Sequence, residues 1–92
     1  MDRISELLQQ HQAVVVDVRT PEEYTNGHLP ESINIPIDQL NNRLGELKLM
    51  NNIIVCCASG MRSKKARLLL MQNDINCIDG GSWLDIHKHL NN

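Results

Sequence analysis

The spacing of hydrophobic residues changes repeatedly along the chain between a helical and an extended pattern. Ile4, Leu7 and Leu8 recur at three- and four-residue intervals, as on one face of a helix. Residues 13–18 instead form a continuous, largely β-branched run, which is typical of a strand covered on both faces. These patterns predict strands over 13–18, 32–35, 52–56 and 75–78, and helices over 3–11, 21–26, 37–44, 61–72 and 83–90.

Capping residues define the helix over 21–26 most sharply. Thr20 suits the N-cap, Pro21 suits the first helical position, and Glu23 completes a capping box with Thr20. Asn26 and Gly27 then end the helix.

Three further local features are expected. The helix over 37–44 should fray near Gly45, and residues 79–82 should form a turn. The helix over 61–72 should be amphipathic, with its basic residues away from the buried face.

Strands that alternate with helices at this spacing predict an α/β fold, with a parallel sheet and helices on both faces. A chain of 92 residues has room for one core, so we expect a single domain over residues 1–92. Ligands in such folds bind beyond the carboxyl ends of the strands. The candidate site residues therefore lie within 17–20, 34–37, 56–62 and 79–82.

Composition narrows the class of protein. Hydrophobic residues make up 41% and charged residues 22%, which excludes a disordered chain. No apolar run approaches the roughly 18 residues of a membrane span, and no secretory pattern begins the chain. A net charge of −2 argues against nucleic-acid or membrane partners. Three cysteines without a signal segment predict reduced thiols and a cytoplasmic protein, or a periplasmic one if a signal segment has been removed.

The candidate chemistry lies where the third predicted strand ends. Cys57 is expected just outside that strand, with a helix beginning inside the loop that follows. Helix-start amides and the helix dipole favour a thiolate, so the pKa of Cys57 should be lowered. Gly60 permits a positive φ, which lets successive amides converge on one point. Ala58 and Ser59 leave this hollow open, and the hydroxyls of Ser59 and Ser63 can donate to an anion. A buried, inert cysteine is the structural alternative.

Positive charge is concentrated beside this loop. Four of the nine Lys and Arg residues lie within residues 62–67: Arg62, Lys64, Lys65 and Arg67. Such a cluster can attract an anion, although an ordinary solvated helix face explains the lysines equally well.

Several segments of the chain, in order and over nearly its whole length, resemble the rhodanese-type sulfurtransferases. Residues 16–24, followed by 27–30 and 33–36, are similar to the first signature region of that family. Residues 57–63 resemble its active-site loop, and residues 79–83 resemble its late Gly-Gly…Trp segment.

This resemblance implies that Cys57 is the nucleophile and holds a persulfide, with no cofactor. The implied substrate-binding residues are those of the loop: Ala58, Ser59, Gly60, Met61, Arg62 and Ser63. The implied partners are a small anionic sulfur donor such as thiosulfate, and a thiol acceptor or sulfur-relay protein. The family's first strand has little room here, because the first predicted helix already begins near residue 3, so the sheet should have four or five strands.

Two other functions remain open. One is a cysteine phosphatase or an arsenate reductase. Cysteine phosphatases use a similar cradle, closed by an arginine, with five residues between Cys and Arg, whereas four residues separate Cys57 from Arg62. A cradle shortened by one residue suits a single sulfur atom better than a phosphate. The domain could also be a non-catalytic sulfur carrier or a redox sensor, since fold does not fix function.

Asp17, Arg19 and His28 are candidates for supporting the pocket. For Asp17 and Arg19, an internal ion pair is favoured over contact with substrate. For His28, a hydrogen bond to a loop carbonyl is favoured. Trp83 should anchor the last helix in the core.

The remaining cysteines and histidines predict little chemistry. The side chain of Cys56 should point away from that of Cys57, because neighbours on a strand alternate. Cys77 should be inert packing within its strand. His87 and His89 should face different sides of a helix, so no metal site is expected.

Overall fold

The computed structural model describes residues 2–90, and within them every predicted strand and helix is present. The strands are β1 (Val14–Asp17), β2 (Ile33–Asn34), β3 (Ile53–Cys57) and β4 (Cys77–Ser82). The helices are α1 (Arg3–Gln9), α2 (Pro21–Thr25), the 3-10 helix η1 (Ile37–Arg43), α3 (Leu44–Lys48), α4 (Met61–Gln72) and α5 (Trp83–Leu90). None of these helices is long and apolar enough to cross a lipid bilayer.

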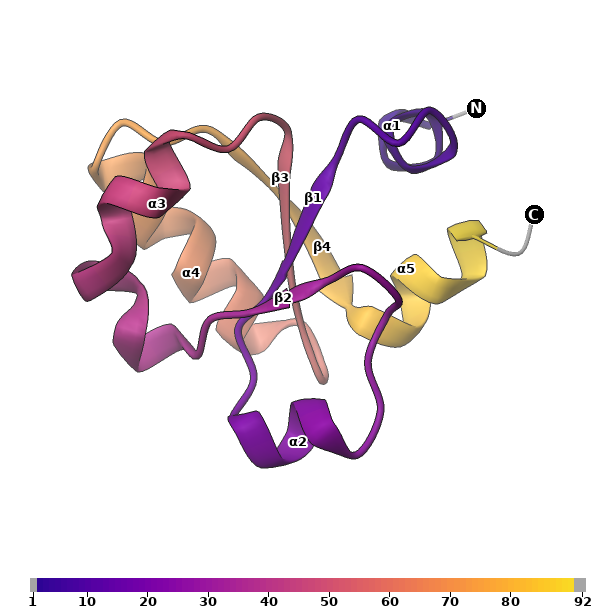
Figure 1. The fold of residues 1–92 in the computed structure, drawn as a ribbon, viewed down its shortest axis with the longest axis horizontal. Helices are drawn as coiled ribbons and strands as arrows, with labels where there is room; N and C mark the ends of the chain where they lie inside the picture. The colour runs from indigo at the N-terminus through magenta and orange to yellow at the C-terminus, as the bar shows by residue number, and fades with distance from the viewer. Residues whose placement is uncertain (1, 91–92) are drawn as a thin grey trace.

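The four strands form one parallel sheet in the order β2-β1-β3-β4 (Figure 1). From β1 the chain crosses to β2 on one side, and from β3 it crosses to β4 on the other. The strand order therefore reverses between β1 and β3, where the register pairs Asp17 with Cys56. Ligands of open parallel sheets bind beyond the strand ends at such a switch point.

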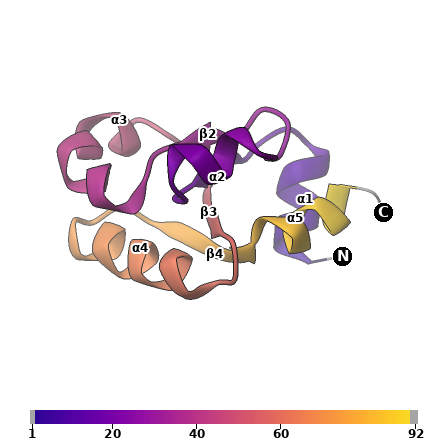
Figure 2. The ribbon, with the colours of Figure 1, turned by 90° about the horizontal axis from the view of Figure 1, so that it is seen from below.

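Helices cover both faces of the sheet, as the continuous apolar strands predict. On one face η1, α3 and α4 pack a core that includes Leu40, Leu47 and Leu70. On the other face α1 and α5 pack a second core that includes Ile86, with Leu8 against it. Figure 2 shows the strands between these two layers.

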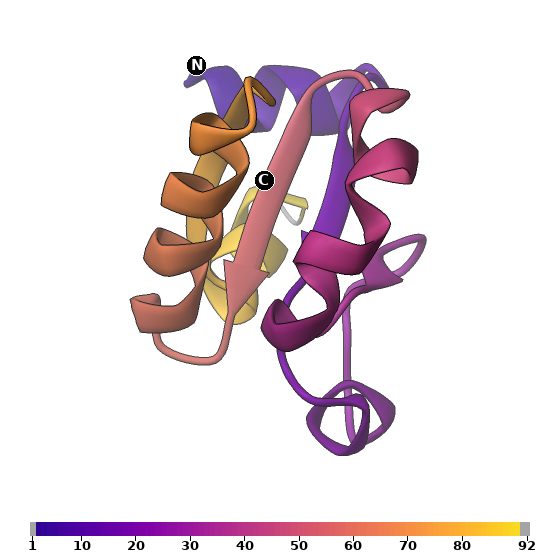
Figure 3. The same ribbon diagram turned by 90° about the vertical axis from the view of Figure 1, so that its left-hand side faces the viewer.

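Helix α2 lies beyond the carboxyl ends of the strands (Figure 3). Its capping box is confirmed: Oγ1 of Thr20 accepts from the amide of Glu23 at 3.2 Å, and Oε1 of Glu23 accepts from the amide of Thr20 at 3.1 Å. Pro21 occupies the first turn, and Asn26 is the C-cap residue. Local sequence thus positions α2 beside the end of the sheet where the candidate site lies.

The predicted turn at residues 79–82 is wrong, because these residues belong to β4, in which Asp79 and Ser82 pair with β3 on either side of a register shift. Close packing explains the glycine that suggested a turn. A Cβ atom on Gly80 would lie 2.6 Å from Cδ1 of Ile86 and 2.8 Å from Cγ2 of Ile54. Only glycine fits between this strand, its neighbour and the helix that follows.

Two helix predictions are also corrected. The chain does not fray near Gly45 but continues from η1 into α3, because Leu40 and Leu47 are both buried on the same core. Helix α4 buries Ala66 and Leu70 as expected, yet its opposite face is not purely polar. That face also exposes large apolar side chains, Met61, Leu68 and Met71.

Candidate active site

Cys57 is the last residue of β3, and its sulfur lies under the loop that leads into α4. The expectation of a position outside the strand is wrong, because pairing of Cys57 with Ser82 extends the ladder by one position. Cys57 is only 1% exposed. Ala58 and Ser59, which follow it, are exposed. The buried cysteine is thus followed directly by two exposed, small residues.

The loop folds back so that its backbone meets the sulfur. The amide of Gly60 donates to Sγ of Cys57 at 2.9 Å, and Gly60 has the positive φ, 99°, that the sequence predicts. The hydroxyl of Ser63 donates to the carbonyl oxygen of Gly60 at 3.0 Å and also interacts with the sulfur. Because Gly60 directly precedes α4, the sulfur faces the positive end of the helix dipole.

These contacts oppose burial in setting the pKa of Cys57. Burial raises the pKa of this thiol, but the Ser63 hydroxyl and the amides of Ser63, Gly60 and Ser59 stabilise the thiolate. The net result is a pKa below the ordinary value for cysteine. Hydrogen bonds to the charged form are the physical cause.

The adjacent cysteine provides an internal contrast. Cys56 packs in the core on the α1 and α5 side, whereas Cys57 belongs to the core on the α4 side, which confirms the predicted alternation. Burial, followed by the charge of Asp17, raises the pKa of Cys56 to about 12. Burial also raises the pKa of Cys77. Thus only Cys57 has surroundings that favour a thiolate.

The predicted ion pair between Asp17 and Arg19 is confirmed. Nη2 of Arg19 lies 2.7 Å from Oδ2 of Asp17, and Nε donates to Oδ1 at 2.9 Å, with both residues buried. The guanidinium also donates to the carbonyl oxygen of Gly27 at 2.8 Å and lies 4.8 Å from the centre of the Trp83 ring. Hydrogen bonding to Asp17 raises the pKa of Arg19. This group connects β1, the segment after α2 and α5.

The side chain of Arg62 pairs with Glu23, for which the sequence predicts only a role in capping a helix. Its Nη1 lies 2.6 Å from Oε1 of Glu23, and its Nη2 donates to Oε2 at 2.9 Å. The side chains of both residues are about one third exposed. Arg62 lowers the pKa of Glu23 to about 2, so the pair stays charged through the neutral range. No local pattern indicates this contact, because 39 residues separate the partners.

His28 lies against α2 rather than against Cys57. Its Nδ1 is 2.7 Å from the carbonyl oxygen of Tyr24, so the favoured hydrogen bond to a backbone carbonyl is present, but the carbonyl belongs to α2 and not to a loop. The two rings stack with centroids 3.8 Å apart. His28 is exposed, and its contacts support the turn after α2.

His89 links α5 to α1. Its Nδ1 lies 2.6 Å from the hydroxyl oxygen of Ser5, which joins α5 to α1. Across residues 2–90 no group of three or more His, Cys, Asp and Glu side chains is arranged to hold a metal ion.

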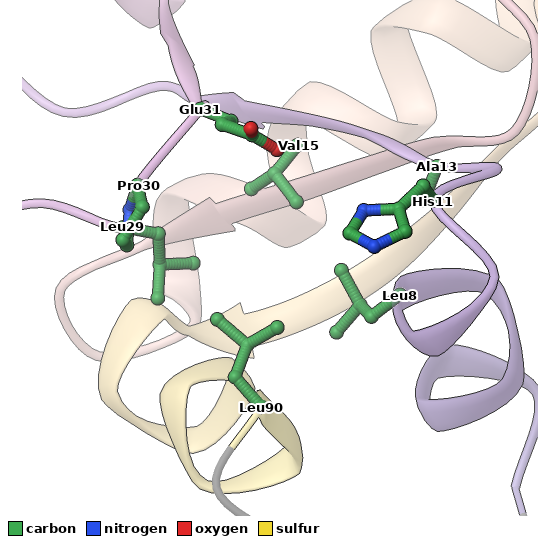
Figure 4. A pocket seen from close by; sticks show the side chains of 8 residues that line it. All are labelled: Leu8, His11, Ala13, Val15, Leu29, Pro30, Glu31 and Leu90. Carbon is green, nitrogen blue, oxygen red and sulfur yellow. The ribbon is translucent and has the colours of Figure 1, made fainter.

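A separate pocket of about 280 Å³ lies on the opposite face of the sheet (Figure 4). Leu8, Val15, Leu29 and Leu90 provide most of its apolar lining, and His11 and Glu31 stand beside them. None of the candidate site residues lines this pocket. This pocket is therefore distinct from the candidate site around Cys57.

The fold and the site together define a class of α/β protein. In this class a cysteine ends a parallel strand, and amides of the loop that follows the strand contact its sulfur. The chain belongs to the rhodanese-like domain family, whose sequence model matches residues 1–83. A rhodanese-related protein from Thermoplasma volcanium has the same fold, with a TM-score of 0.76 and 33% identity. That match covers 88% of this chain and 82% of the other.

Two curated relatives are sulfurtransferases by name. The sulfurtransferase of Allochromatium vinosum is 34% identical over 59 residues, which cover 64% of this chain and 55% of that protein. The thiosulfate sulfurtransferase GlpE of Pseudomonas syringae pv. syringae is 29% identical over 80 residues, covering 84% of this chain and 76% of that protein. The match to the first relative thus spans little more than half of its length.

Proposed function

We propose that the protein is a sulfurtransferase that moves a sulfane sulfur from thiosulfate, or a similar anionic donor, to a thiophilic acceptor through a persulfide on Cys57. The observation that carries this proposal is the 2.9 Å hydrogen bond from the Gly60 amide to Sγ, in a site that lowers the pKa of Cys57. Sulfurtransferases among the relatives support the same chemistry.

The reaction divides into two displacements. The Cys57 thiolate attacks the outer sulfur of thiosulfate, a new S–S bond forms, and sulfite leaves with the electron pair of the broken bond. The persulfide anion then occupies the amide cradle. An acceptor such as cyanide or a thiolate attacks the outer sulfur, and Cys57 regains its electron pair as a thiolate. No net oxidation of the protein occurs.

Neither displacement needs a general acid, because sulfite and the Cys57 thiolate both leave as stable anions. This agrees with the position of His28, which is bound to the Tyr24 carbonyl rather than to the loop. Ala58 and Ser59 are small and exposed, so a modest displacement of the loop admits the terminal sulfur of the donor.

The ion pair of Arg62 argues against phosphoryl transfer. A phosphatase of this type needs a free arginine to close the cradle around phosphate oxygens. Here Glu23 occupies the guanidinium with two hydrogen bonds, and the loop is one residue shorter than a phosphatase cradle requires. We therefore favour transfer of a single sulfur atom.

Intact-mass spectrometry after treatment with thiosulfate tests the proposal. We expect one added sulfur atom, located on Cys57 by peptide mapping and removed by cyanide or dithiothreitol. A protein that gains no sulfur from thiosulfate, yet accepts one from a persulfidated thiol, would be a sulfur carrier rather than a thiosulfate sulfurtransferase. A protein that gains sulfur on Cys56 or Cys77 instead would contradict the assigned site.

Arg62 is proposed to attract the donor, and Glu23 to moderate that attraction. Replacing Glu23 with glutamine removes the opposing charge and keeps the capping box, since glutamine also serves there. At low ionic strength we expect E23Q to lower the KM for thiosulfate by about two- to fivefold, and R62A to raise it by a similar factor.

Steady-state kinetics at two salt concentrations measure this effect. The changes in KM caused by E23Q and by R62A should both be smaller at high salt, because ions screen exposed charges. A KM that is unchanged in R62A at low ionic strength would remove Arg62 from the donor site.

A further inference from the structure

The outer side of α4 combines exposed apolar and basic side chains next to the candidate site. Met61, Leu68 and Met71 are 72%, 59% and 44% exposed. Their spacing of seven and three residues places them on one face of the helix. Figures 2 and 3 show α4 on the outside of the fold, with no other element covering its outer side. We call this face, with its basic residues, the α4 surface: Met61, Lys64, Lys65, Arg67, Leu68 and Met71.

The basic residues of the α4 surface lack acidic partners. Within residues 2–90 no carboxylate lies at ion-pair distance from Lys64, Lys65 or Arg67, in contrast to Arg62. Three unpaired cations gather here although the whole chain has a net charge of −2.

A hollow of about 300 Å³ continues this surface toward the edge strand β4. Its lining comprises Lys64, Arg67, Leu68 and Asp79. The carboxylate of Asp79 accepts a hydrogen bond from the amide of Gly81 at 2.9 Å. Positive charge therefore exceeds negative charge in the hollow, which suits an acidic side chain from a partner.

The α4 surface begins at the cradle itself. Met61 directly follows Gly60, whose amide contacts the sulfur of Cys57. From Met61 to Met71 the helix rises about 15 Å, so a segment lying along it would have one end over the loop. Docking at this surface would hold a reactive group close to Cys57.

We propose that the α4 surface docks an acidic protein segment with apolar side chains, and that this partner carries the thiol that takes sulfur from Cys57. The docking rests on the charge and exposure of α4, and the transfer rests on the proposed function. Unpaired lysines favour an acidic partner, and exposed methionines adapt to varied apolar contacts. Because the rest of the chain is acidic, the same partner is repelled elsewhere and oriented here.

The transfer step is a simple exchange. The partner's thiol loses its proton to solvent, and the resulting thiolate attacks the outer sulfur of the Cys57 persulfide. The bond between that sulfur and Sγ breaks, and its electron pair returns to Cys57 as the thiolate. The partner leaves as a persulfide, and no external oxidant or reductant takes part.

Two synthetic acceptor peptides test the proposal. Both carry one cysteine and the same leucines, but one contains glutamates where the other contains lysines. With sulfur-loaded protein at low ionic strength, we expect transfer to the acidic peptide to be about tenfold faster than to the basic one. Dithiothreitol serves as a neutral reference acceptor, and product masses give the rates.

Charge reversal on α4 provides the matched comparison. The double variant K64E/K65E should lose the preference for the acidic peptide, measured as the rate relative to dithiothreitol. K48E makes the same kind of change on an exposed lysine at the end of α3, near the amino end of β3, and should retain the preference. L68Q should weaken transfer to the acidic peptide at high salt as well, because apolar contact is not screened.

A binding measurement separates the docking from the sulfur chemistry. Serine versions of both peptides, which cannot accept sulfur, are titrated while backbone amide signals of α4 are followed by NMR. Shifts confined to α4 with the acidic peptide support docking even if Cys57 takes no sulfur from thiosulfate. Equal binding of both peptides, or equal loss of preference in K48E and K64E/K65E, would overturn the proposal.

Discussion

Replacing Cys57 with serine is expected to lower the transfer of sulfur from thiosulfate to cyanide by more than about a thousandfold. A hydroxyl at this position is neither a thiolate nor able to form a persulfide, so the covalent intermediate is lost. Serine is close in size to cysteine and can still accept a hydrogen bond from Gly60, so the fold should be retained. Cyanide assays together with circular dichroism spectra of the variant measure both effects.

The other two cysteines supply the controls. C56A and C77S remove thiols whose pKa values are raised by burial, and we expect each variant to keep most of the wild-type activity. If C57S were nearly as active as the wild type, the nucleophile would be another group. If C56A folded but were inactive, Cys56 would be needed for the reaction, and the assignment of the chemistry to Cys57 alone would be wrong.

Replacing Asp17 with alanine is expected to destabilise the protein by about 3–5 kcal/mol. The change leaves the guanidinium of Arg19 buried without its counter-charge, while Arg19 still contacts Gly27 and Trp83. Asp17→Asn keeps one acceptor oxygen and should fall between alanine and the wild type. Urea unfolding curves give the free energies, and the asparagine variant preserves the comparison if the alanine variant fails to fold.

An exposed ion pair provides the matched control for this prediction. Arg43 and Glu46 form a pair at 2.8 Å on the surface, and E46A should lower the free energy of unfolding much less than D17A does. Water solvates Arg43 after the change, whereas it cannot reach Arg19. Equal losses in D17A and E46A would show that the buried pair is not a main support of the fold.

The buried pair also bears on the geometry of the cradle. Asp17 ends β1 in register with Cys56, next to Cys57, and Arg19 ties this strand end to the Trp83 ring at the start of α5. Cys57 and Ser82 pair across β3 and β4 just before that helix. The ion pair thus joins residues at the carboxyl end of the sheet, from which the loop departs. We therefore propose a positioning role for this pair, without contact to a donor.

Much of the architecture could be predicted from local pattern. Continuous β-branched runs indicate buried parallel strands, and the Thr20–Glu23 capping box specifies where α2 begins. The loop from Cys57 to Ser63 could likewise be predicted, because the residues that shape it are neighbours in the chain. Gly60 has the positive φ that its position requires.

Other features could not be read in this way. The Gly-rich segment at 79–82 indicated a turn, but it belongs to β4. Gly80 is a glycine because Ile54 and Ile86 pack too closely against this strand for a side chain. Helical spacing predicted which face of α4 is buried. It could not show that Leu68 and Met71 stay exposed, which depends on whether another element packs against the rest of the helix. In both cases the outcome depends on which residues from distant parts of the sequence pack against the segment.

The sequence by itself determined the order of strands and helices and the loop around one cysteine, because spacing and backbone freedom act between near neighbours. Only the tertiary structure decided that Glu23 binds Arg62 and that Trp83 covers Arg19, since parallel crossovers bring together residues that are 39 and 64 positions apart. The burial of individual side chains depends on the same crossovers, because these determine which segments cover them. For this reason the sulfur of Cys57 lies beneath its loop rather than at the surface.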